Sequence, residues 1–111
     1  MSLIHHKGLT KEKWSQLSFA EQMANIGAEV GRSIIQKEAN NQEYANLAFE
    51  RALELFDITR SLQKSFPKLK EVSRAREVYC DFFLGDNMYK NTGKSLNSYF
   101  LQFNLLARQN R

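Results

Sequence analysis

The sequence predicts an all-α protein in which four long helices form an antiparallel up-down-up-down bundle, preceded by a short N-terminal helical turn. Two observations lead to this fold class. Apolar residues recur at intervals of three and four, the spacing of an amphipathic helix, and they never alternate for long at intervals of two. One proline and five glycines in 111 residues leave little material for turns, which favours a few long elements with short connections.

The first long helix is expected to begin at a capping box. Ser18 precedes Glu21 by three residues, the spacing at which each side chain accepts a hydrogen bond from the other residue's backbone amide. The polar run 40–42 marks the end of this helix. Upstream, Trp14 is the apolar anchor of a short turn over residues 11–16 that caps one end of the bundle. We therefore divide the chain into an N-terminal tail with a helical turn (1–17) and a single bundle domain (18–111).

The second long helix is expected over residues 42–63. Its apolar positions cover more than half of its circumference, and a helix with so wide an apolar face usually contacts more than one neighbour, in its own bundle or in another subunit. The positions expected to face inward are Tyr44, Ala48, Ala52, Leu55, Ile58, Thr59 and Leu62, flanked by Phe49, Leu53 and Phe56.

The third long helix is expected to open at Pro67, because proline suits the first helical turn, and to end at Gly85 in a left-handed cap conformation. A loop leads to the fourth helix over residues 95–109, whose expected inner face is Leu96, Tyr99, Phe100, Phe103, Leu106 and Ala107. The expected core of the bundle comprises Phe19, Met23, Ile26, Val30, Leu55, Ile58, Val72, Tyr79, Phe82, Phe100 and Phe103.

A stripe of small residues runs along the first long helix: Ala20, Ala24, Gly27 and Gly31. A glycine inside a helix costs about 1 kcal/mol relative to alanine, so close approach of a partner helix is the expected compensation. That partner lies either within the chain or across an oligomer interface. Because this stripe and the wide apolar face of the second helix together exceed what one small bundle buries, we expect a homo-oligomer, most simply a two-fold dimer.

Charged residues on the helices form a candidate inter-helix polar cluster. Arg76 lies on an apolar stripe, so it must be paired, and Glu29, Glu54 and Asp57 are the available partners. The alternative to an ion pair is an anion site or a polar catalytic centre in the bundle. Arg74, Glu77 and Asp81 have the spacing of ion pairs on one helix surface. The full cluster is Glu29, Arg32, Glu54, Asp57, Arg74, Arg76, Glu77 and Asp81.

We assign no catalytic, cofactor-binding or metal-binding residue and expect no cofactor. Glu50, Glu54 and Asp57 share one helix face, which is interpreted as solvated rather than metal-binding because no histidine follows His6. Cys80, the only cysteine, has no histidine in any helix to activate it. No phosphate-binding glycine loop is present. No apolar run is long enough for a membrane span or a signal peptide, so we expect a cytoplasmic protein without membrane contact.

Positive charge is expected to gather at one end of the bundle, which we call the basic pole. There the N-terminal tail, the turn between the second and third helices and the C-terminus meet. The pole contains Lys7, Lys11, Lys13, Arg60, Lys64, Lys68, Lys70, Arg108 and Arg111, against Glu12, Glu21 and Glu71. Such a pole is either a solvated end or a surface for phosphates or acidic proteins. The candidate nucleic-acid or anion contacts are Lys11, Lys13, Arg60, Lys64, Lys68, Lys70 and Arg108.

Three segments, residues 14–30, 51–59 and 74–87, resemble a family of short, uncharacterised prokaryotic helical proteins, a likeness that carries no known activity. In architecture the chain is also similar to the four-helix-bundle proteins encoded in ribosomal RNA intervening sequences and to the accessory proteins of diversity-generating retroelements. These resemblances imply a homo-oligomer with a basic surface and nucleic-acid contacts. They rest on size, helix count and charge, so no functional residue is carried over from them.

The sequence therefore favours a non-catalytic, oligomeric helical-bundle interaction or adaptor protein, with weak and nonspecific binding of nucleic acid at the basic pole. The alternative is a small helical enzyme or toxin-like effector that uses the glutamate, aspartate and arginine side chains between the helices. These alternatives differ in one structural respect. An enzyme requires the charged groups to converge in a pocket open to solvent, whereas an interaction protein allows them to pair off between helices.

Overall fold

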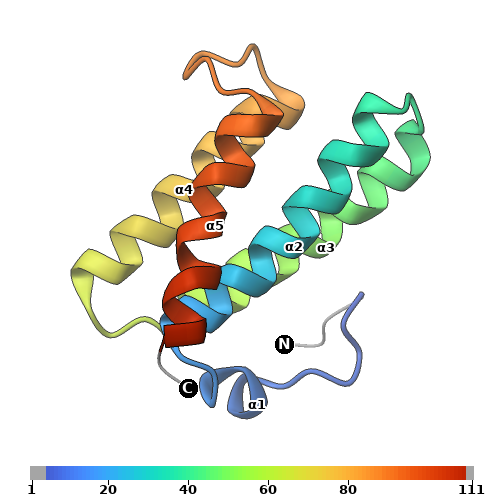
Figure 1. Cartoon of the computed structure of the whole chain (residues 1–111). Coiled ribbons are helices and arrows are strands. Elements are labelled where there is room, and N and C mark those ends of the chain that lie inside the picture. The colour runs from blue at the N-terminus through green and yellow to red at the C-terminus, as the bar shows by residue number, and fades with distance from the viewer. Residues whose placement is uncertain (1–4, 110–111) are drawn as a thin grey trace.

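The structure is a computed structural model that describes residues 5–109 of the chain. The regular elements in this range are all helices, and no strand occurs in it, so the all-α prediction is confirmed. The helices are α1 (Lys11–Ser15), α2 (Phe19–Glu38), α3 (Gln42–Leu62), α4 (Phe66–Leu84) and α5 (Gly93–Gln109). Figure 1 shows the short α1 at the end of the molecule where α2 begins.

Local signals in the sequence set the helix starts. The Ser18 hydroxyl accepts from the Glu21 amide at 3.0 Å, and a Glu21 carboxylate oxygen accepts from the Ser18 amide at 2.9 Å, so the capping box is confirmed. Helix α3 begins at Gln42, and α4 begins one residue before Pro67, which lies in its first turn. Helix α5 begins at Gly93, two residues earlier than expected.

Helix α4 ends at Gly85 as predicted, but the left-handed conformation predicted for this glycine is wrong. Gly85 is extended, with φ −98°, and its amide donates to the Asp81 carbonyl at 3.0 Å. The left-handed turn comes at Asn87, with φ 54°, where a side-chain oxygen accepts from the Asn91 amide at 2.9 Å. Asparagine tolerates this backbone region better than most residues because its side chain bonds locally to the backbone, so the left-handed residue comes three positions after Leu84, the last residue of α4.

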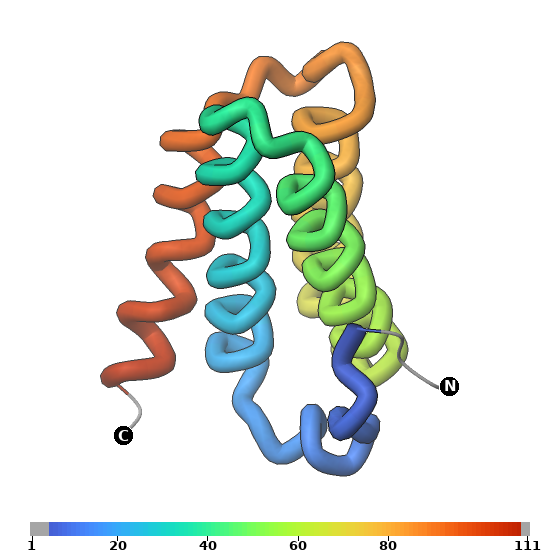
Figure 2. The backbone as a smooth tube through the Cα atoms, turned by 90° about the vertical axis from the view of Figure 1, so that its right-hand side faces the viewer, coloured from blue at the N-terminus to red at the C-terminus, as the bar shows by residue number. Residues whose placement is uncertain are grey.

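Helix α2 is the central element of the packing. It lies against α3 on one side and α5 on the other, while α4 packs on α3 and α1 packs on the end of α3 (Figures 1 and 2). The small-residue stripe explains how closely α5 approaches. A Cβ atom added to Gly27 would lie 2.6 Å from Cβ of Phe100 in α5. The partner of this stripe is therefore a helix of the same chain, and one of the two arguments for an oligomer is removed.

Aromatic rings fill the space between the helices. Phe49 of α3 stacks on Phe83 of α4, with ring centres 4.4 Å apart, and Phe56 and Tyr79 are fully buried beside them. Most of the expected core is confirmed, but some positions differ. Phe19 and Phe82 are only partly buried and pack on the edge of the core. Arg76 is half-buried, with 30% of its side chain exposed.

Two apolar positions expected to face inward are exposed instead. Tyr44 in the first turn of α3 is 63% exposed, and Leu106 near the end of α5 is 46% exposed. Both lie near helix ends, and no neighbouring helix covers them. Helical periodicity identifies the side of a helix that is apolar, but it does not determine how far along that side the neighbour extends.

Two buried hydrogen bonds join helices across the core. The hydroxyls of Ser33 in α2 and Tyr79 in α4 lie 2.5 Å apart. Burial raises the pKa of Tyr79 well above its ordinary value, and the Ser33 bond only partly offsets that shift. The indole Nε1 of Trp14 donates to the Thr59 hydroxyl at 2.8 Å, which fixes α1 on α3.

Across residues 5–109, no helix is both long and apolar enough to cross a bilayer.

Candidate nucleic-acid interface

Three basic segments lie at the same end of the molecule. In Figure 2, α1, the turn between α3 and α4, and the last turn of α5 are all in the lower part of the view. Side-chain contacts support this placement. Lys68 Nζ at the start of α4 lies 5.8 Å from the centre of the Phe19 ring at the start of α2, and that ring lies 6.1 Å from Phe103 of α5. The described part of the basic pole is therefore one region of the fold.

The cations of the basic pole are exposed. Lys11, Lys64 and Lys70 have no side-chain partner among the described residues. The ammonium group of Lys13 donates to the carbonyl of Gly8 at 3.2 Å, which leaves its charge uncompensated. Within the described part of the chain, Arg60 is the only one of the seven candidate contacts with a carboxylate partner, Asp57, at 4.0 Å. Lys7 is also exposed, and Arg111 lies outside the described residues.

Trp14 supports the pole without being part of its surface. Its side chain is 5% exposed, its Nε1 is bonded to Thr59, and its carbonyl accepts from the Gln22 amide group at 3.0 Å. The Trp14 ring is therefore not available to stack on a ligand. It holds α1 in place, so that Lys11 and Lys13 project from a fixed helix.

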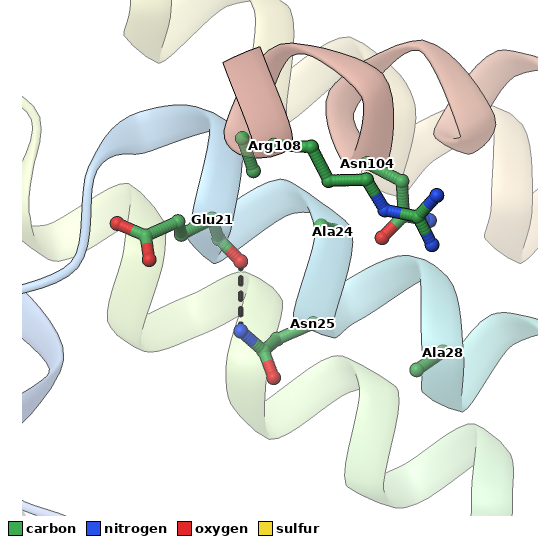
Figure 3. A pocket seen from close by; sticks show the side chains of 7 residues that line it. Glu21, Ala24, Asn25, Ala28, Asn104 and Arg108 are labelled. Carbon is green, nitrogen blue, oxygen red and sulfur yellow. Dashed lines mark hydrogen bonds between the residues drawn. The ribbon is translucent and has the colours of Figure 1, made fainter. Parts of the chain in front are cut away.

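A groove of about 390 Å³ opens between α2 and α5, at the same end of the molecule (Figure 3). Arg108 extends over it beside Asn104, and the carboxylate of Glu21 points away from the guanidinium group. Asn25 lines the opposite wall, with its amide group donating to the Glu21 carbonyl at 2.8 Å. Sequence reasoning missed Asn25 and Asn104, although the neighbouring Ala24 of the small-residue stripe indicated a close approach here.

The inter-helix polar cluster separates into small groups that do not contact one another. Glu29 of α2 accepts from Arg32 at 2.9 Å on its own helix and from Arg51 of α3 at 3.0 Å. Asp57 of α3 accepts from Arg76 of α4 at 3.0 Å, so the predicted pairing of Arg76 is confirmed. Arg51 is not among the residues predicted for this cluster, yet it bridges α3 and α2.

Arg74, Glu77 and Asp81 do not pair with one another, contrary to the spacing argument. All three bind the loop between α4 and α5 through Tyr89. The Tyr89 hydroxyl donates to Glu77 at 2.7 Å, the Tyr89 amide donates to Asp81 at 3.1 Å, and the Arg74 guanidinium lies 4.4 Å from the ring centre. The bond to Glu77 is also the main cause of a raised Tyr89 pKa. These side chains fix a loop, and no local pattern in the sequence identified Tyr89 as their partner.

Glu54 is held by the N-terminal segment rather than by another helix. The His5 amide donates to a Glu54 carboxylate oxygen at 2.7 Å, and the His5 ring lies 3.1 Å from Glu50. The expected solvated acidic face is therefore partly covered at Glu54. Nδ1 of His6 and Oε1 of Glu54 are buried here and have no hydrogen-bond partner among residues 5–109. Within the described part of the chain, no group of histidine, cysteine, aspartate or glutamate side chains has the arrangement of a metal site.

The charged cluster does not line a single cavity. Arg74 borders a small pocket of about 130 Å³ between α4 and α5, together with Tyr99, whereas Arg32 borders a separate groove between α2 and α3. Burial is the main cause of a raised Tyr99 pKa, with Glu71 adding to it. Burial also raises the pKa of the Cys80 thiol, against the opposing effect of Arg76, so this thiol is not activated as a nucleophile.

Comparisons of this chain with known proteins identify no relative. No protein-family model, no curated protein and no solved structure matches this chain. The basic pole is therefore interpreted from its own geometry and charge.

Proposed function

We propose that this chain is a non-catalytic, homo-oligomeric interaction protein that binds nucleic acid weakly, and without sequence preference, through the basic pole. The observation that carries the proposal is that the lysines at that end are exposed and, within residues 5–109, not paired with carboxylates. They are exposed, they lie on helices or a short turn, and none pairs with a carboxylate among the described residues. Phosphates attract such cations with little dependence on base sequence.

The pairing of the inter-helix charges favours this function over the alternative of an enzyme or toxin-like effector. Catalysis by those groups would need several of them in one solvent-open pocket. Glu29 is engaged by two arginines, Asp57 is engaged by Arg76, and Arg74 lies over Tyr89. Because these charged side chains are engaged in separate structural contacts, they favour an interaction protein over an enzyme.

The scaffold in this proposal is the antiparallel up-down-up-down four-helix bundle, with α1 as a cap. The helices that follow one another along the chain are joined by short segments, residues 39–41, 63–65 and 85–92, and short connections favour antiparallel neighbours. The packing of α2 on both α3 and α5 is compatible with that topology. We also propose a cytoplasmic location, where nucleic acid is accessible. The resemblance to nucleic-acid-binding bundles stays a prediction.

The proposed oligomer is a two-fold dimer formed through the end of the α2–α3 pair. Ile35, Tyr44 and Leu47 are exposed there, and they border a groove of about 170 Å³. Arg32 lines the same groove, and the exposed Glu43 stands next to Tyr44 in the chain. Charges of both signs beside an apolar centre are what a surface needs to pair with a copy of itself.

The dimer is tested by light scattering across micromolar concentrations. The wild-type chain is expected at twice the monomer mass, and replacing Tyr44 by glutamate should give the monomer. A monomer mass for the wild-type chain at every concentration contradicts the proposed dimer.

Binding is tested by fluorescence-anisotropy titration with short RNA and DNA oligonucleotides at low salt. Replacing Lys64, Lys68 and Lys70 by glutamine should weaken binding and leave the helical circular-dichroism spectrum unchanged, because these side chains are exposed. A variant with Lys90 and Lys94 replaced by glutamine removes two exposed positive charges from the loop and helix start away from the pole, and it controls for a loss of positive charge elsewhere on the molecule. Absence of binding by the wild-type chain would make the pole a solvated end, and the interaction proposal would then need an acidic protein as its partner.

A further inference from the structure

We infer that the basic pole takes single-stranded nucleic acid, with the ring of Phe66 stacking on an unpaired base while the neighbouring lysines contact the phosphates. This inference rests on the proposed function and adds to it the class of nucleic acid and a residue for the contact. It begins from an aromatic ring that the fold leaves in solvent. Phe66, the first residue of α4, is 73% exposed.

Phe66 is exposed although it lies in a well-formed helix. The Leu69 amide donates to the Ser65 carbonyl at 3.0 Å, so the first turn of α4 is formed around Phe66. Pro67 follows directly and fixes its own backbone angle. A ring on a formed helical turn is held in place before a ligand arrives, which reduces the entropy lost on binding.

The charge around Phe66 is of one sign. Lys64 precedes it by two residues, Lys68 and Lys70 follow by two and four, and all three are exposed. The first turn of α4 contains no acidic side chain. Proteins that bind single strands without sequence preference combine these two components, cations along the backbone and an aromatic ring under a base.

An unpaired strand fits this surface better than a duplex. In a duplex the base faces are covered by their neighbours, so a ring reaches one only after unstacking. A single strand presents its base faces freely, and every base has a face on which an aromatic ring can stack. The preference expected from Phe66 is therefore for single strands of any sequence, and the lysines alone would give no such preference.

A protein partner or a membrane fits the surface less well. Both usually require a continuous apolar patch, or an amphipathic helix with several apolar anchors on one side. Phe66 is instead a lone exposed ring, with Ser65 and Pro67 as its direct neighbours in the chain and lysines on either side of these. The other exposed aromatic side chains are Tyr44, in the first turn of α3, and Tyr89, in the loop between α4 and α5, both at the opposite end of the molecule.

The test compares wild type and Phe66→Ala in anisotropy titrations at low salt, with labelled oligothymidine, oligouridine and a duplex of the same length. The Kd of Phe66→Ala for both single strands should rise about fivefold or more, and its Kd for the duplex should stay unchanged. Phe66→Tyr keeps a ring and should restore binding. Leu84→Ala is the matched control, because it removes an apolar side chain of similar exposure, 69%, from the other end of the same helix, outside both the pole and the proposed dimer surface.

The outcomes separate this inference from the proposed function. If the lysine variant binds more weakly while Phe66→Ala binds single strands as the wild type does, the stacking role is overturned and the proposed function stands. If the wild-type chain binds no nucleic acid, both fail. Vesicles of anionic phospholipid are the counter-probe: binding to vesicles that depends on Phe66, together with single-strand binding that does not, would assign the ring to a membrane. Unchanged circular dichroism of Phe66→Ala verifies the fold.

Discussion

Replacing Gly27 by alanine should destabilise the protein, although the same change in most helices stabilises. A Cβ at Gly27 would lie 2.6 Å from Cβ of Phe100, whereas ordinary contacts begin at 3.4 Å, so α5 would have to retreat by most of that difference. Overpacking of this kind costs about 1–3 kcal/mol, against a gain of about 1 kcal/mol in helix propensity. The expected net change is a loss of up to about 2 kcal/mol in the free energy of unfolding.

Gly31 is the matched control for Gly27, because it lies one turn further along the same stripe. Its nearest neighbour for a new Cβ is the Asn97 side-chain oxygen at 3.6 Å, an ordinary contact. Gly31→Ala should therefore stabilise the protein by about 1 kcal/mol. Urea denaturation followed by circular dichroism measures both variants. Equal or greater stability of Gly27→Ala relative to wild type would refute the packing of this stripe on α5.

Further predictions concern three side chains that are buried or paired. Tyr79→Phe should cost about 1 kcal/mol through the lost bond to Ser33, measured by urea denaturation. Burial raises the Tyr79 pKa above its ordinary value of 10.0, so the unfolded chain loses the phenolic proton at a lower pH than the folded chain does. The free energy of unfolding of the wild type should therefore fall as the pH rises above 10.0, and that of Tyr79→Phe should fall less. Asp57→Asn should cost only about 0.5 kcal/mol, since its pair with Arg76 is partly exposed, and the cost should disappear in high salt. The Cys80 thiol, with its raised pKa, should react with a disulfide reagent more slowly in the folded protein than in urea.

The helix starts could be predicted because their causes are local. Ser18 and Glu21 are three residues apart and satisfy each other's amides, and Pro67 restricts only its own neighbourhood. The pairing of Arg76 could also be predicted, since a charge on an apolar stripe requires a partner. Choosing Asp57 among three candidates required the packing of α4 on α3.

The contacts that sequence reasoning missed join residues far apart in the chain. His5 binds Glu54 across 49 positions, and Trp14 binds Thr59 across 45. Periodicity does not report such pairs, because it describes one element at a time. No role is assigned to Phe66 from the sequence. The structure shows that Phe66 is exposed, because no other element in the described range covers its side chain in the first turn of α4 at the basic pole.

Binding of nucleic acid at the basic pole is tested most directly by the salt dependence of the anisotropy titration with oligothymidine. Each phosphate neutralised on a single strand contributes about 0.7 to the slope of log K against log salt concentration. Replacing Lys64, Lys68 and Lys70 by glutamine should therefore reduce the slope by about 2 if all three contact phosphates. The Lys90 and Lys94 variant should keep the wild-type slope. Equal slopes for the wild-type chain and the triple variant would contradict phosphate binding by the pole.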